Sequence, residues 1–129
     1  MKKQILLVEP DRLLSNTYEL ALEDAGYKVI SANTAQAAIL ASDKNRPDLV
    51  ILEVQLVEHS GIEFLYEFRS YEEWQNIPVI INTMVSPSEF KDNYKILKDE
   101  LGVSLYLYKP QSSLRELLSS IKEVDLQPV

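Results

Sequence analysis

The sequence predicts an α/β domain: a doubly wound, five-stranded parallel sheet of order 2-1-3-4-5, covered by five helices. Three observations lead to this fold class. Short apolar runs recur along the chain, each is followed by a segment with helical spacing of its apolar residues, and turn or capping residues separate them. The 129 residues suit a single domain. We expect it to span residues 1–125, with residues 126–129 as a tail or the start of a linker.

The predicted strands are short runs rich in branched or aromatic apolar residues, and the run at 49–52 is apolar without the alternation of a half-exposed strand. The five runs cover residues 5–8, 27–32, 49–52, 77–81 and 103–108. Uninterrupted apolar runs of this length are typical of parallel strands that are buried on both faces. Pro78 lies near the beginning of its run, where a strand can spare a backbone donor.

The first two helices are predicted from the residues at their ends. Asp11 can cap a helix that ends at Gly26, and Asn33 or Thr34 can start an alanine-rich helix that ends near Asn45.

The other three helices follow the later strands. The third is expected from Gly61 to Arg69, and capping-box sequences at 86–89 and 113–116 predict the starts of the fourth and fifth. The expected buried face of the fourth helix consists of Phe90, Tyr94, Leu97 and Leu101.

Composition excludes several classes of function. The formal net charge is −7 and the pI is near 4.7, which argues against nucleic acid or an anionic membrane as the main partner. The absence of cysteine excludes a disulfide framework and a thiolate metal site. We expect a cytoplasmic domain, because no apolar run approaches the length of a membrane span.

Polar residues follow four of the predicted strands. In this topology the carboxyl ends of strands one, three, four and five converge at one edge of the sheet, where open α/β sheets carry their sites. The converging residues are Glu9, Pro10, Asp11, Glu53, Thr83 and Lys109. Acids of this kind can hold Mg²⁺, a carboxylate can attack a phosphoryl group, and a hydroxyl and an ammonium can hold phosphoryl oxygens.

Four motifs resemble the receiver domain of bacterial two-component response regulators. They are ILLVE at 5–9, PDLVIL at 47–52 with Ser60-Gly61, PVIINT at 78–83 and YLYKP at 106–110. The resemblance covers nearly the whole chain and implies a flavodoxin-like fold and a role in phosphorelay signalling.

The resemblance also implies roles for individual residues. Glu53 stands where the family has its phospho-accepting aspartate, and Glu9 matches the first acid of the metal site. Pro10 replaces the second acid, so we expect a weak Mg²⁺ site or none, formed by Glu9 and Glu53 with Asp11 as a possible further ligand. The extra methylene of Glu53 moves its carboxylate outward by roughly 1.5 Å. Lys109 can then pair with Glu53 directly.

The remaining matches concern signal output. Thr83 corresponds to the family's switch hydroxyl, Tyr106 to its aromatic switch residue and Lys109 to its lysine. Met84 stands where a small residue is usual, which predicts a narrower approach to the site. The span from Thr83 to Lys109 is about one helical turn longer than usual, which predicts an extended fourth helix.

These matches predict a degenerate receiver, a pseudo-receiver without catalytic residues that is not an enzyme and acts without phosphorylation. We expect a protein partner or a homodimer, bound through the fourth helix, fifth strand and fifth helix. A sensor kinase or an effector domain outside this sequence is a further possible partner. The alternative is a working phospho-acceptor that uses Glu53 or a nearby acid with Mg²⁺. A flavodoxin-like or nucleotide-binding enzyme is disfavoured, because no Gly-rich phosphate loop follows strand one.

Two aromatic positions have simpler interpretations. His59 is expected in a surface loop, and Trp74 is expected to cover the third helix.

Overall fold

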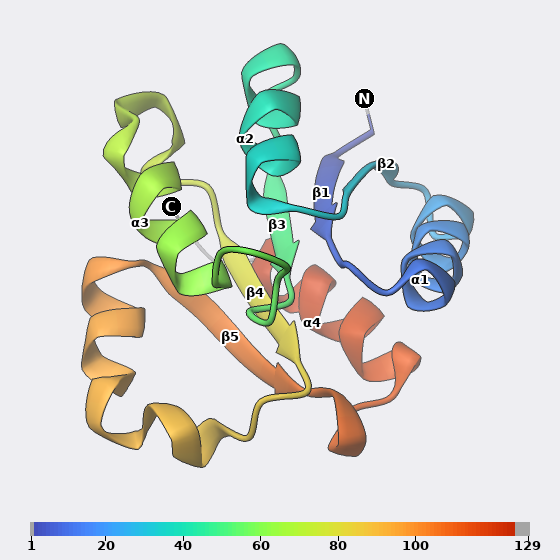
Figure 1. The fold of residues 1–129 in the computed structure, drawn as a ribbon. Coiled ribbons are helices and arrows are strands. Elements are labelled where there is room, and N and C mark those ends of the chain that lie inside the picture. Colours follow the sequence, from blue (N-terminus) through green and yellow to red (C-terminus); the bar gives the residue numbers. More distant parts are fainter. Residues whose placement is uncertain (1, 126–129) are drawn as a thin grey trace.

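The computed structural model describes residues 2–125 and confirms the predicted sheet. All neighbouring strands are parallel, and their order is β2-β1-β3-β4-β5 (Figure 1). The strands are β1 Gln4–Val8, β2 Lys28–Ala32, β3 Leu49–Leu52, β4 Val79–Thr83 and β5 Val103–Tyr108. The central strands β3 and β4 are buried along their whole length, as the continuous apolar runs predict. The predicted tail, residues 126–129, lies outside the described residues.

Four α-helices accompany the strands, and a side-chain cap lies at the start of each; at the last of them Ser113 and Glu116 form the predicted capping box. The helices are α1 Arg12–Asp24, α2 Ala35–Lys44, α3 Gly61–Ser70 and α4 Leu114–Asp125, the last being the fifth helix of the sequence prediction. Asp11 and Thr34 accept hydrogen bonds from the first turns of α1 and α2. Ser60 and Glu63 form a reciprocal capping box at α3.

The segment predicted as the fourth helix is helical, but within it only Tyr94 and Lys95 are α-helical. It consists of a 3-10 helix, η2 Pro87–Asn93, followed by a π-helical turn, η3 Ile96–Glu100. The Ser86 hydroxyl accepts from the Ser88 N–H rather than from Glu89, so the predicted capping box does not form. The π-helical turn is closed by a hydrogen bond from the Leu101 N–H to the Ile96 carbonyl, just before β5 begins.

The burial of this segment differs from the expected pattern for the same reason. Leu97 and Leu101 are buried, and Phe90 is half-buried. Tyr94, predicted on the buried face, is 58% exposed. A helix without the 3.6-residue period does not keep positions four residues apart on one face. The segment is therefore helical over about the predicted length, but the buried face predicted for it is wrong at Tyr94.

Two apolar layers cover the sheet. On one face α2 and α3 pack against the sheet, and on the other face α1 and α4 do so (Figure 1). The segment η3 and Trp74 belong to the same apolar layer as α2 and α3. Gly61 allows α3 to start against the end of β3, because a Cβ there would lie 2.6 Å from Val54 Cα.

Trp74 and Arg69 join the end of α3 to the rest of this layer. Trp74 is 3% exposed and stacks on Phe68, with ring centroids 5.0 Å apart, so it covers α3 as predicted. The Arg69 guanidinium donates to the carbonyls of Trp74, Leu101 and Gly102. Burial lowers the pKa of Arg69.

Candidate functional site

The centre of the candidate site is the carboxylate of Glu53, which follows β3 and is only 4% exposed. One oxygen accepts hydrogen bonds from the Thr83 hydroxyl and, at 3.0 Å, from the Gln55 N–H. The other accepts from the Met84 N–H at 3.2 Å and from Lys109 Nζ at 2.7 Å. Four donors from three chain segments therefore satisfy this buried carboxylate.

Lys109 links Glu53 to a second buried acid. Its ammonium lies 2.7 Å from Glu53 Oε1 and 2.6 Å from Glu9 Oε1, and the Lys109 side chain is only 7% exposed. Glu9, which follows β1, is 3% exposed and also accepts from the Asp11 N–H at 3.0 Å. One cation thus neutralises part of the charge of two acids that the fold holds together.

The pKa values of the pair follow from these contacts. Burial alone would raise the pKa of Glu53, but the hydrogen bonds from Lys109, Thr83 and Gln55 outweigh it and hold that pKa below its usual value. Burial would likewise lower the pKa of Lys109, but Glu53 and Glu9 outweigh it and raise that pKa. At neutral pH the site therefore contains two charged partners, the Glu53 carboxylate and the Lys109 ammonium.

The residues present do not fit a Mg²⁺ site. The Lys109 ammonium already lies between the carboxylates of Glu9 and Glu53, where a cation would have to bind both. Pro10 has no carboxylate, and the Asp11 carboxylate caps α1 through the Leu14 N–H at 3.0 Å. Within residues 2–125, no group of three or more His, Asp or Glu side chains is arranged to hold a metal ion. The described part of the chain therefore offers a cation only the carboxylates of Glu9 and Glu53, and both are already paired with Lys109.

A chain of hydrogen bonds runs from the acid to the aromatic switch position. The Thr83 hydroxyl donates to Glu53 and accepts from the Val85 N–H at 3.1 Å, and the Tyr106 hydroxyl donates to the Val85 carbonyl at 2.6 Å. Burial, with the negative charges of Glu53 and Glu89, raises the pKa of Tyr106 to about 12. The Tyr106 hydroxyl is thus a fixed, protonated donor.

Sequence reasoning identified the side chains of this site but missed its backbone donors. The N–H groups of Met84 and Gln55 both bind Glu53, and residue type carries no signal for either. The Met84 side chain is 54% exposed. It therefore lies outside the buried carboxylate cluster that its backbone joins.

The parallel sheet and the acid, hydroxyl and lysine at its carboxyl edge define a signalling domain of the receiver type. The family model for the response regulator receiver domain matches residues 5–122. The chain belongs to this family.

Curated relatives agree with this assignment. The chain is 35% identical over 106 residues to the KDP operon transcriptional regulatory protein KdpE of Escherichia coli, covering 82% of the chain and 44% of that protein. It is 32% identical over 124 residues to the alkaline phosphatase synthesis transcriptional regulatory protein PhoP of Bacillus subtilis, covering 96% of the chain and 49% of that protein. The chain therefore spans about half the length of these relatives.

Solved structures show the same fold. The chemotaxis response regulator CheY4 of Vibrio cholerae matches with a TM-score of 0.84 at 26% identity, covering 96% of this chain and 99% of that chain. The non-phosphorylated HemR receiver domain of Leptospira biflexa matches with a TM-score of 0.82 at 27% identity, covering 99% and 98%. Within residues 2–125, no helix has the length and apolar character that a membrane crossing requires.

Proposed function

We propose that this receiver domain takes up no phosphoryl group and serves as a protein-interaction module held permanently in one state. The main support for this proposal is the position of Lys109, whose ammonium lies 2.6 Å from a Glu9 oxygen and 2.7 Å from a Glu53 oxygen. The proposal makes the domain a non-enzymatic component of cytoplasmic two-component signalling.

The chemistry of Glu53 supports the absence of phosphoryl transfer. Its carboxylate accepts four hydrogen bonds, so attack on a phosphoryl group requires that these contacts be broken. We also expect little metal assistance, because Pro10 lacks a carboxylate and Glu9 and Glu53 share the Lys109 ammonium. A nucleophile displaced by about 1 Å from the productive geometry can lose on the order of 100-fold in rate.

The contacts of Thr83 support a fixed state of the output region. In the family, uptake of a phosphoryl group provides the negative charge that draws in the switch hydroxyl. Here the Glu53 carboxylate provides a permanent charge to the Thr83 hydroxyl, and Tyr106 is bound to Val85. With no modification to favour another state, this arrangement persists.

The interaction face of this proposal comprises η2, η3, β5 and α4. Tyr94 in η2–η3 is 58% exposed and Leu114 at the start of α4 is 37% exposed, while every β5 side chain is partly exposed. We propose that a protein partner binds this face. A second copy of this chain is the partner that can be tested directly.

Sedimentation velocity over a concentration series tests this function. We expect self-association without any phosphodonor, weakened by Glu53→Gln and by Lys109→Ala through the hydrogen-bond chain. Tyr94→Ala should weaken it directly, and Leu20→Ala on α1 is the matched control. A dimer that none of the first three substitutions affects would contradict the proposal.

A further inference from the structure

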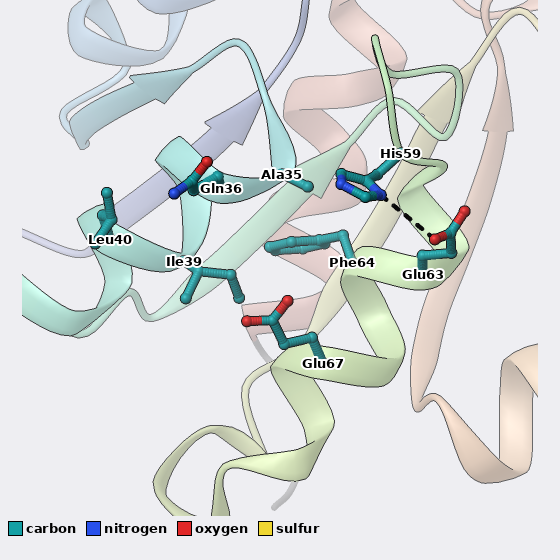
Figure 2. A pocket seen from close by; sticks show the side chains of 8 residues that line it. All are labelled: Ala35, Gln36, Ile39, Leu40, His59, Glu63, Phe64 and Glu67. Carbon is teal, nitrogen blue, oxygen red and sulfur yellow. Dashed lines mark ion pairs between the residues drawn. The ribbon is translucent and has the colours of Figure 1, made fainter.

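We propose that the groove between α2 and α3 binds a basic segment of a partner protein and seats one of its arginine or lysine side chains against Glu67. The groove has a volume of about 490 Å³ and is lined by side chains of both helices (Figure 2). It is separate from the face formed by η2, η3, β5 and α4, so the inference does not depend on that interface.

The floor of the groove is apolar and buried. Phe64 is 1% exposed and packs against Phe68 with ring centroids 5.4 Å apart, and Ala35 is also buried. Ile39 is half-buried beside them, and Leu40 on the rim is 57% exposed. The aliphatic stem of a long side chain gains apolar contact on such a surface while its charged end stays near water.

The polar lining determines the charge of the occupant. Figure 2 shows the Glu67 carboxylate beside Ile39 and Phe64, at the opposite end of the groove from His59. Glu67 makes no side-chain hydrogen bond or ion pair with any other residue in the range 2–125. Glu63 pairs with His59 at 3.5 Å, so the carboxylate of Glu67 is the one left for a partner.

The charge balance favours a cation over other ligands. Glu63 and Glu67 are four residues apart on α3, where like charges destabilise a helix. The chain as a whole carries a formal charge of −7. A guanidinium or ammonium on Glu67 relieves the repulsion, whereas nucleic acid and anionic lipid would increase it. No cationic side chain in the described part of the chain pairs with Glu67. The nearby Arg69 guanidinium binds backbone carbonyls instead.

A peptide titration followed by ¹⁵N–¹H NMR tests the inference. The probe is a peptide of alternating leucine and arginine, and the comparison peptide has glutamate in place of arginine. We expect saturable shifts in residues 35–40 and 59–67 with the basic peptide alone. Glu67→Gln should weaken its binding about two- to fivefold, as expected for one exposed ion pair, and added salt should weaken it further.

Two controls make each outcome decisive. Glu23→Gln removes an exposed acid on α1 and should leave the affinity unchanged, and urea unfolding should show that Glu67→Gln is folded. Equal weakening by both substitutions, or shifts spread over the whole acidic surface, would mean non-specific attraction and overturn the proposal. Equal binding of the acidic peptide or an unchanged affinity in Glu67→Gln would also overturn it.

Discussion

The ammonium of Lys109 is the group whose removal should disturb the site most. Lys109→Met keeps an aliphatic side chain but leaves the carboxylates of Glu9 and Glu53, which are 3% and 4% exposed, without their shared cation. Removing one member of a buried ion pair costs about 3–5 kcal/mol, because the remaining charge stays buried. A domain of this size has a stability of roughly 5–15 kcal/mol, so the variant should fold with a much smaller margin.

Urea unfolding monitored by Trp74 fluorescence measures this loss, because Trp74 is buried and stacked in the folded state. With a urea dependence of roughly 2 kcal/mol per molar, the midpoint should fall by about 1.5–2.5 M. Lys98→Met is the matched control at an exposed position, and it should change the stability by less than about 0.5 kcal/mol.

The pH dependence of the stability of Lys109→Met provides a second, independent test of the role of the ammonium. Without the ammonium, burial and the neighbouring acid raise the pKa of one carboxylate, so protonation relieves the destabilisation as the pH falls. The stability gap between wild type and variant should therefore narrow from about pH 7 to about pH 5. A loss below about 1 kcal/mol, or one equal to that of Lys98→Met, would refute the proposed role of the ammonium.

Three further substitutions test neighbouring contacts by the same unfolding assay. Thr83→Val removes a buried donor to Glu53 and the acceptor of the Val85 N–H, so it should lose about 1–3 kcal/mol, most of which Thr83→Ser should restore. Gly61→Ala places a Cβ 2.6 Å from Val54 Cα and should lose at least about 1–3 kcal/mol; an unchanged stability would contradict the close packing. Glu53 has a lowered pKa when folded, so its stabilisation is complete above the unfolded pKa of about 4.3 and is lost as the pH falls through the folded pKa. The stability difference between wild type and Glu53→Gln should shrink accordingly in acid, and a difference that stays constant would count against this pKa shift.

Much of the fold was predictable because its signals are local. Asp11 and Thr34 cap α1 and α2 at the predicted positions, and the buried runs form parallel strands in the predicted order. The fourth helical segment was not predictable from local spacing. Its 3-10 and π turns bury Leu97 and Leu101 in the layer that α3 also forms, and packing of distant segments outweighs the α-helical period there.

In the candidate site, too, some contacts were predictable from the sequence and others were not. Side-chain chemistry and topology predicted that Glu53 and Lys109 would pair, and the structure places them 2.7 Å apart. The backbone donors at Gln55 and Met84 depend on the loop path and not on residue type. The role of Arg69 depends on carbonyls up to 33 residues away, so nothing near it in the sequence indicates that contact.

The most direct test of the central claim is the intact mass of the protein after incubation with acetyl phosphate and Mg²⁺. The account predicts an unchanged mass for the wild type, because Glu53 is held by Lys109 and Thr83 and the acids provide no Mg²⁺ site. The variant Glu53→Asp/Pro10→Asp is the positive comparison, since it supplies the acids expected of the family, and it should gain one phosphoryl group. A stable wild-type adduct of one phosphoryl group on Glu53 would contradict the account.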